Sequence, residues 1–503
     1  MTNRSLSGQR IRPEEWLLIA CILFTFLWRF VAMLWIPALY PLNDYFPMLW
    51  AALAACLACR GQTWRRKSVW ILGAGLGLIF LRCLFGGMET LQGGLKAVSG
   101  GVLAFGVCYQ AAFGLRKEAL LSFLRLLLGL WTALATLLSL AGLWAALYDQ
   151  VLSTPMGGVY VLGLQDNRLN LLTYCTDSAS LLALSLVAAV TGLLMTRRTP
   201  GRILYALCCV VLFVTLSLTV TRTAFITLGL SLGLVAACAA LTGLRKVKAV
   251  PRWCRRALCL LLVAVFTVGM YQALNYTLEL FNGAKVHLRA AAEETLVPLD
   301  EVTPPAETEA PAADAGNVET LSQRPIQLDA SILSGRQYVW LGALRVLQSN
   351  PWYLLYGISV VQPMLLVNPL TGVELSYYHM HCMYLQVLVE CGIPGLILLM
   401  MFLWRFARCA WKLTRDGSKP LWMRTLPVLP ICILVAELVE CLTLLSFNNP
   451  VLPFLLLFMG MTVRFAEDPQ GPDPREGAGM KTLKVLLQKY KDIVPVSYTH
   501  LRA

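Results

Sequence analysis

Charged side chains are scarce in this chain of 503 residues. Asp, Glu, Lys and Arg together make up 14% of it, whereas soluble domains carry about 25%. Hydrophobic residues make up 57%, and apolar runs of about 20 residues, the length that crosses roughly 30 Å of hydrocarbon, recur along the sequence. The shortage of charge excludes an ordinary soluble protein and predicts an all-α polytopic membrane protein.

Several other features are missing. The 16 cysteines lie almost entirely inside apolar runs, where cysteine acts as a small hydrophobe, so no disulfide framework is predicted. The first apolar run lacks a small-residue cleavage site, and we expect it to remain as a helix. Histidine is also rare, because the chain has only 4. Two of them, His379 and His381, stand where a polar loop meets an apolar run.

We predict about twelve transmembrane helices. The net charge of +14 is explained by the bias of basic residues toward cytoplasmic loops, and no nucleic-acid partner is predicted. With a cytoplasmic N-terminus, the short inner segments collect basic residues, and the short outer segments hold only Arg168 and Arg222. The predicted helices are 16–36, 45–59, 68–85, 95–114, 119–147, 170–195, 203–220, 223–243, 257–278, 382–406, 425–445 and 450–465.

One connection is much longer than the others. Nine helices are predicted within 1–278 and three within 382–465, and residues 279–381 between them form a large extracytoplasmic loop. Its middle, 293–325, is rich in Pro, Ala, Glu and Thr and is predicted to be a disordered spacer. Residues 334–350 predict an amphipathic helix on the outer membrane surface. The apolar face of this helix is assigned to Val339, Leu341, Leu344 and Leu347.

The C-terminal residues 466–503 are predicted to be a cytoplasmic tail. The stretch from about 480 begins like a fresh N-terminus, and its final "VSYTHLRA" resembles a translated adapter sequence. We therefore expect that these last residues do not belong to the native protein.

Three stretches, in order, resemble the O-antigen ligase and polymerase superfamily. They are "LSLTVTRTAFITLGLSL" (216–232), "LSGRQYVWLGALRVLQSNPWYLLYGIS" (333–359) and "SYYHMHCMYLQVLVECGIPG" (376–395). The first resembles a helix break at which Arg usually follows Ser, and here Thr221 precedes Arg222. The third resembles a His-Asn-x-x-Leu-Gln…Glu-x-Gly-x-x-Gly signature, although Cys382 stands where Asn is usual. The residues that match are His381, Leu385, Gln386, Glu390, Gly392 and Gly395.

The resemblance implies a multi-pass enzyme of the bacterial plasma membrane whose active site is on the extracytoplasmic face. Such enzymes move a glycan from an undecaprenyl-diphosphate carrier to a hydroxyl acceptor, which is another glycan, a lipid or a protein. The outer segments hold no Asp-x-Asp pair for a metal-bound nucleotide sugar. Arginine binds phosphate oxygens through a planar fork. Arg168, Arg222 and Arg336 are therefore predicted to bind the donor. The alternative is that they are arginines at helix ends whose side chains extend to the lipid headgroups.

His381 is the predicted catalytic base, because imidazole titrates near neutral pH and can accept a hydroxyl proton. His379 and Glu390 are predicted to contribute to substrate binding. No metal and no cofactor are predicted, since no third ligand accompanies the two histidines. The resulting hypothesis is a metal-independent, inverting ligase or polymerase. A transporter or flippase of lipid-linked sugars is the alternative, although the internal repeats expected of many transporters are not found.

Overall fold

The computed structural model describes residues 12–33, isolated positions between 70 and 81, and 108–153, 161–165, 167–173, 175–244, 251–295, 336–358, 380–438 and 451–467. The predicted helix 45–59, most of 68–85 and 95–114, and the tail after 467 lie outside these ranges. So does the predicted spacer 293–325, except for residues 293–295, which are helical.

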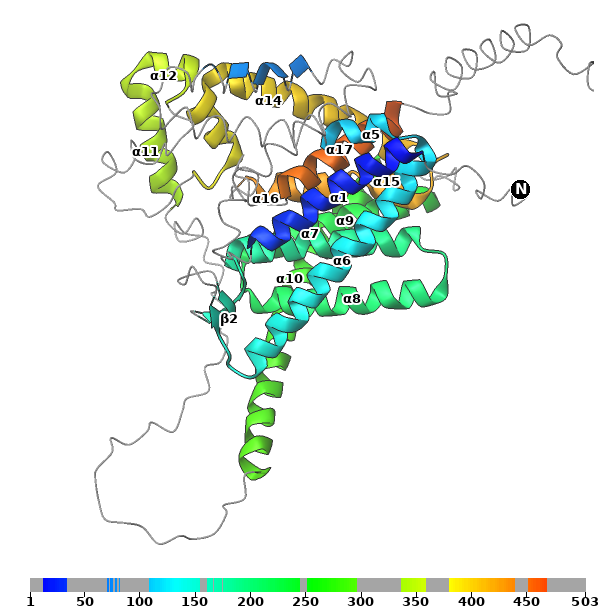
Figure 1. The fold of residues 1–503 in the computed structure, drawn as a ribbon, viewed down its shortest axis with the longest axis vertical. Coiled ribbons are helices and arrows are strands. Elements are labelled where there is room, and N and C mark those ends of the chain that lie inside the picture. Colours follow the sequence, from blue (N-terminus) through cyan, green and yellow to red (C-terminus); the bar gives the residue numbers. More distant parts are fainter. Residues whose placement is uncertain are drawn as a thin grey trace, which may run out of the picture.

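Helices dominate the described residues (Figure 1). Within them, six helices are long and apolar enough to cross a membrane, namely α6, α7, α8, α9, α10 and α14. They confirm a helical membrane protein, and the count of twelve stays a prediction. The helices are α1 Pro13–Met33, α5 Gln110–Gly114, α6 Lys117–Leu147, α7 Cys175–Met195, α8 Thr199–Leu218, α9 Arg222–Leu244, α10 Arg252–Thr295, α11 Arg336–Ser349, α12 Pro351–Tyr356, α14 Met383–Arg415, α15 Leu421–Thr425, α16 Val428–Ala436 and α17 Val451–Glu467.

The outer surface of the bundle is apolar where lipid is expected. Leucine and valine side chains on α8 and α10 are more than half exposed, whereas α7, which has similar hydropathy, is mostly buried. A soluble protein rarely exposes apolar patches of this extent. The exposed side chains include Leu204, Leu207, Leu260, Leu261 and Val265.

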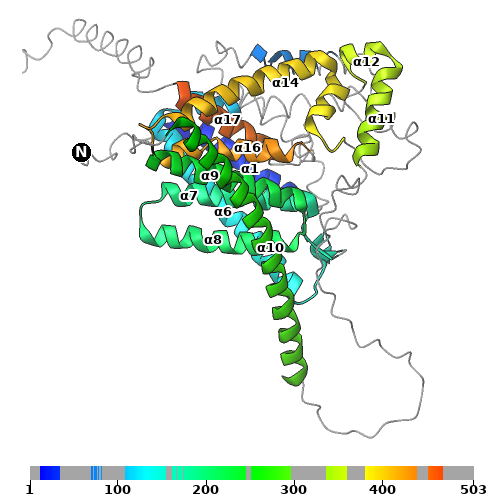
Figure 2. The same ribbon diagram turned by 180° about the vertical axis from the view of Figure 1, so that it is seen from behind.

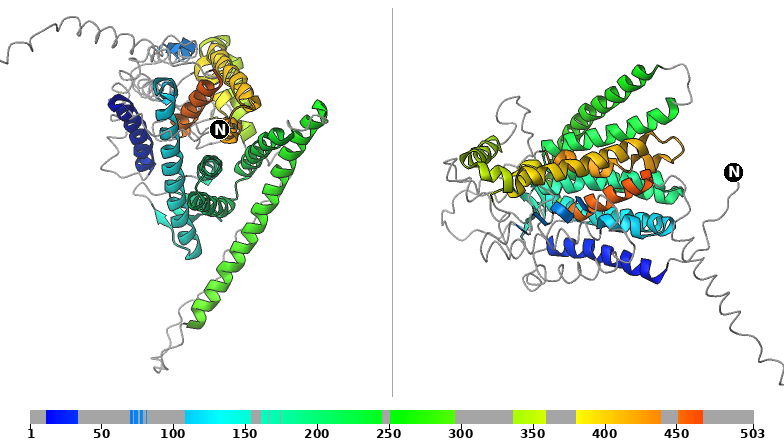
Figure 3. Two further views of the ribbon diagram at one scale, coloured as in Figure 1. Left: turned by 90° about the vertical axis from the view of Figure 1, so that its right-hand side faces the viewer. Right: turned by 90° about the horizontal axis from the view of Figure 1, so that it is seen from above.

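The long helices run back and forth between two ends of the bundle, which Figure 3 shows in its right-hand view. The basic end carries the α5–α6, α7–α8 and α14–α15 connections, and the sheet end carries the α8–α9 break, the start of α14 and a small β-sheet (Figure 1). Figure 2 shows α9 and α10 side by side from behind. Described basic residues of the basic end are Arg116, Lys117, Arg197, Arg198, Arg202, Arg255, Arg256, Lys412, Arg415, Lys419 and Arg424.

The all-α prediction is wrong at the sheet end. Strands β1 (Leu152–Ser153), β2 (Val161–Gln165) and β3 (Arg168–Leu171) form an antiparallel sheet in the order β1-β2-β3. Leu162 pairs with Leu171, and Gln165 pairs with Arg168. The predicted helix 170–195 therefore begins only at Cys175. Strand β3 alternates polar and apolar residues in the order Arg, Leu, Asn, Leu, which favours a strand, but an average of hydropathy hides this alternation.

Helix α10 is much longer than the predicted 257–278. Its 44 residues span about 66 Å, more than twice the hydrocarbon thickness. The residues after 278 include charged side chains, so they do not resemble a membrane span, but Ala, Leu, Glu and Lys are good helix formers. The extension is attached to the bundle where buried Lys285 forms a salt bridge with Asp149, between α6 and β1.

Trp131 lies at the centre of the main core. This residue is 2% exposed, and its ring contacts Phe454 at a centroid distance of 4.3 Å and Phe26 edge-on at 5.8 Å. The indole N–H donates to the Ser185 hydroxyl at 2.9 Å. One tryptophan thus joins α1, α6, α7 and α17, and its single polar group is satisfied inside the bundle.

Glu15 holds the start of α1 against the start of α6. The Arg116 guanidinium donates from Nε to Oε1 at 2.9 Å and from Nη2 to Oε2 at 2.8 Å. The backbone N–H groups of Arg12 and Arg116 donate to the same carboxylate at 3.0 Å each. Four donors compensate for the burial of this carboxylate.

Replacing Glu15 with Gln should therefore destabilise the bundle. Glu15→Gln removes the charge and turns one acceptor oxygen into an amide donor that faces Arg116. We expect a loss of about 2 kcal/mol in the free energy of unfolding, because hydrogen bonds to charged groups contribute about 1.5–3 kcal/mol. Thermal unfolding in detergent measures the loss. Glu118→Gln, which changes an exposed glutamate near the same helix start, is the control and should be neutral.

Candidate functional site

His381 lies in a tight turn just before α14. Its φ of 50° is in the left-handed region, which few residues other than glycine adopt, with histidine among the more frequent exceptions. The side chain is partly exposed, and both ring nitrogens are buried. Residues held in such backbone conformations cluster at active sites and ligand clamps. The predicted base therefore occupies a fixed and strained position at the sheet end.

The residue before it is held on both sides. The backbone N–H of Met380 donates to Gln386 Oε1 at 2.9 Å, and its carbonyl accepts from the Trp340 indole at 2.8 Å. Gln386 Nε2 in turn donates to Glu390 Oε1 at 2.7 Å. Glu390, predicted to bind substrate, thus contacts Gln386 and belongs to the support of the His381 turn.

The α11–α12 pair packs directly on the first part of α14. A Cβ atom on Gly357 would lie 2.2 Å from the Glu390 carbonyl oxygen, and one on Gly392 would lie 2.7 Å from the Leu355 carbonyl carbon. Both glycines have positive φ, 81° and 66°. The Ile358 N–H donates to the Val389 carbonyl at 2.6 Å. Glycine is required at both positions, because the two backbones touch there.

A second core cluster fills this contact. The buried members are Val339, Ala343, Val346, Leu347, Ile358, Met380 and Val389. The prediction of a helix at 334–350 agrees with α11, but its apolar face was only partly correct. Leu341 and Leu344 are 52% and 42% exposed, because the buried face of α11 is turned toward Gly342, Ala343 and Val346.

Arg336 is the first residue of α11. It lies four residues before Trp340, so the two side chains share one face of the helix. Since the Trp340 indole contacts the residue next to His381, this face of α11 is directed toward the His381 turn. The structure thus brings Arg336 and His381 into one region, although they are 45 residues apart in the sequence.

Arg222 begins α9, directly after the break from α8. Val220 in the break has a φ of 49°. The hydroxyls of Ser217, Thr219 and Thr221 are bonded to nearby backbone carbonyls at 2.6–3.1 Å. These bonds tie the three side chains to the backbone at the end of α8 and in the break. A helix N-terminus and a guanidinium group therefore lie together at the sheet end, and both attract anions.

Helix α16 relates Arg222 to His381. Arg424 at the basic end donates to the Cys238 carbonyl at 3.4 Å, and Cys432 is hydrogen-bonded to Ser231, so α15–α16 runs antiparallel to α9. Beyond these two contacts, α9 continues back to Arg222 at its start. The antiparallel α16 continues forward to buried Glu437, whose carbonyl accepts from the Met383 N–H at 3.1 Å. Both predicted site residues are therefore at the sheet end.

Arg168 lies on β3, also at the sheet end. Its Nη1 is 3.5 Å from the Cys175 sulfur, and no contact between Arg168 and the His381 turn is found in the described residues. His379 is outside the described residues.

Three residues that support the site, Trp340, Gly357 and Glu437, have no role assigned to them from the sequence. For Trp340, the available sequence signal is its position one helical turn after Arg336, which places both residues on one face of the helix.

Within the described ranges, no group of three His, Cys, Asp or Glu side chains lies close enough to hold a metal ion. Because His379 is outside those ranges, metal independence stays a prediction.

The bundle of apolar helices and its polar end define a multi-pass membrane protein with a candidate anion site at one end. Residues 207–400 match the O-antigen ligase family. The match confirms the resemblance to the O-antigen ligase and polymerase superfamily. It includes Arg222, Arg336, His381 and Glu390, and it does not reach Arg168. No curated protein matches the chain significantly.

The contact at Gly357 provides a test of the site's architecture. Gly357→Ala adds a Cβ atom that meets the α14 backbone, and it places a side chain at positive φ, at a cost of about 1–3 kcal/mol. We expect the Ile358 N–H to exchange with deuterium faster, because α12 moves off α14. Gly283→Ala on α10, where nothing lies within 4 Å of the new Cβ atom, is the control. Unchanged exchange at Ile358 would contradict the packing described.

Proposed function

We propose that this protein is a membrane glycosyltransferase of the O-antigen ligase type. It moves a glycan from an undecaprenyl-diphosphate carrier to the hydroxyl of a glycan, lipid or protein acceptor. The observation that carries the proposal is the gathering of Arg222, Arg336 and the His381 turn at one end of the bundle, within a region that matches the O-antigen ligase family. The sheet end is then the extracytoplasmic face of a bacterial plasma membrane.

The distribution of charge supports this orientation. The basic end collects arginines and lysines from the α5–α6, α7–α8 and α14–α15 connections and from the start of α10, as cytoplasmic loops do. The proposed layout has twelve membrane helices, with the basic end inside and the segment between α10 and α14 outside. Arg222, Arg336 and Arg168 at the sheet end depart from the rule, and phosphate binding explains why arginine is retained there.

Each group has a role in the proposed transfer. The acceptor oxygen attacks the anomeric carbon opposite the carrier, and the bond from that carbon to the diphosphate oxygen breaks, which inverts the configuration. His381 takes the hydroxyl proton. Arg222 and Arg336 neutralise the charge that develops on the leaving diphosphate, so that no metal ion is needed.

A transporter of lipid-linked sugars is the competing function. Transporters commonly bind substrate at helices broken near the membrane midplane, and α14 is interrupted at Gly392. This break is filled by the backbone of α12, since Leu354 and Leu355 atoms lie within 2.8 Å of a Cβ atom built on Gly392. The interruption therefore serves packing between helices and favours the enzyme.

The orientation can be tested by labelling. In a background without reactive native cysteines, Gln348→Cys on α11 should react with a membrane-impermeant maleimide in intact cells. Gly417→Cys, in the exposed turn between α14 and α15, should react only after permeabilisation. The opposite pattern would place the sheet end in the cytoplasm and refute the proposed site.

The catalytic role of His381 can be tested with purified lipid-linked donor in liposomes. His381→Ala should lower glycan transfer about 10²- to 10⁴-fold, the range for loss of a general base, while donor binding stays nearly unchanged. His287→Ala, which changes an exposed histidine on α10, is the matched control and should transfer normally. Normal transfer by His381→Ala would remove the base from the mechanism. Movement of intact donor across the bilayer, with no transfer product, would favour the transporter.

A further inference from the structure

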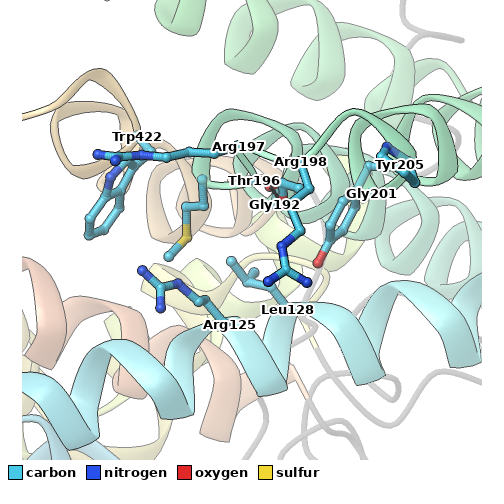
Figure 4. Close-up of a pocket in the computed structure, with 11 residues that line it drawn as sticks. Arg125, Leu128, Gly192, Thr196, Arg197, Arg198, Gly201, Tyr205 and Trp422 are labelled. Carbon is cyan, nitrogen blue, oxygen red and sulfur yellow. Dashed lines mark hydrogen bonds between the residues drawn. The ribbon is translucent and has the colours of Figure 1, made fainter. Parts of the chain in front are cut away.

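A pocket of about 810 Å³ lies at the basic end (Figure 4). The His381 turn is at the opposite end of the bundle. The pocket lies between α6, the α7–α8 connection and α15. The proposed glycan transfer gives this pocket no role, because the residues proposed for transfer lie at the opposite end of the bundle. Its lining consists of Arg125, Leu128, Gly192, Met195, Thr196, Arg197, Arg198, Pro200, Gly201, Tyr205 and Trp422.

Three arginines contribute to the lining. Figure 4 shows Arg125 and Arg198 reaching into the space between α6 and the α7–α8 connection, and Arg197 extending toward Trp422. All three are exposed, and among the residues that the structure describes none of them forms a salt bridge. Their charges are thus available to an anion. Guanidinium groups suit phosphate in particular, because their planar fork matches its oxygens.

The start of α8 adds to the positive potential. Arg198 is its N-cap residue, and its side chain makes no capping hydrogen bond to the first turn of the helix. Pro200 and Gly201 in this first turn line the same pocket. An uncapped helix N-terminus attracts negative charge, and three neighbouring arginines strengthen the effect.

The back wall of the pocket is built rather than incidental. A Cβ atom on Gly192 would lie 2.4 Å from Tyr205 Cε1, and one on Gly129 would lie 3.7 Å from the Tyr205 hydroxyl. These glycines on α7 and α6 make room for the tyrosine ring between the two helices. Trp422 is held edge-on by Phe465 at a centroid distance of 6.3 Å. Aromatic rings and a tyrosine hydroxyl therefore line a site that is both apolar and cationic.

We propose that this pocket binds the phosphate headgroup of an anionic phospholipid from the leaflet at the basic end. The headgroup lies among Arg125, Arg197 and Arg198, and the acyl chains follow the exposed apolar face of α8, which begins with Ile203, Leu204 and Leu207 directly beyond the pocket. A soluble phosphate would use only the arginines, whereas a lipid uses both surfaces. Basic pockets between membrane helices bind anionic headgroups in this way.

The test is native mass spectrometry of the full-length protein released from nanodiscs that contain phosphatidylcholine and phosphatidylglycerol. The wild type should retain phosphatidylglycerol in preference to phosphatidylcholine. Arg125→Gln, Arg197→Gln and Arg198→Gln should each weaken retention about fivefold, the fold-change that corresponds to about 1 kcal/mol per basic residue near the membrane surface. Arg198→Lys should lie between wild type and Arg198→Gln, because it keeps the charge and loses the fork.

Arg256→Gln is the matched control, since Arg256 is exposed at the same end on α10 and does not line the pocket. It should retain phosphatidylglycerol like the wild type. A loss as large in Arg256→Gln as in the pocket variants would mean nonspecific attraction and overturn the proposal. Equal retention by all pocket variants would also overturn it. Displacement of the lipid by inorganic phosphate at equal concentration would assign the site to soluble phosphate instead. These outcomes do not depend on glycan transfer.

Discussion

The close approach of two backbones, at Gly357 and Gly392, determines how the sheet end is assembled. Where α12 meets α14, neither chain has room for a Cβ atom, so the interruption of α14 and the docking of α11–α12 are parts of one contact. Through Trp340 and Gln386 this contact fixes Met380, and with it the turn that carries His381. A position set by backbone contact and by two side-chain hydrogen bonds is more rigid than one set by a flexible loop.

Much of the fold follows from hydropathy alone. The helices α6 to α9 and α14 occur close to the predicted spans, because an apolar run of this length can satisfy its backbone groups only as a helix. The failures have the same origin. Hydropathy describes whether a segment is surrounded by lipid or by water. A prediction based on it therefore ends the span at 278, although α10 continues to Thr295, and misses the polar–apolar alternation in β3. Both errors fall where the chain leaves the apolar region.

The site was predicted unevenly. Arg222 and Arg336 stood out because basic residues are rare on the predicted outer face, and His381 stood out because histidine is rare and the family resemblance selects it over His379. Their supports were not visible. Trp340 resembles any interfacial aromatic residue, and Glu437 looks like the end of a span until its buried position beside Met383 is known. Contacts between residues 40 or more positions apart depend on how helices pack, and local patterns do not contain that information.

The length of α10 has a mechanical consequence. Beyond the bundle this helix is a stiff rod, and the salt bridge between buried Lys285 and partly exposed Asp149 is its point of attachment. A force applied to its tip acts through a lever arm of about 15 Å, from Lys285 to Thr295. The resulting torque is delivered to the corner between α6 and β1, and from there to the small sheet that carries Arg168. Tension outside the membrane would therefore reach the sheet before it reaches the helices that hold His381.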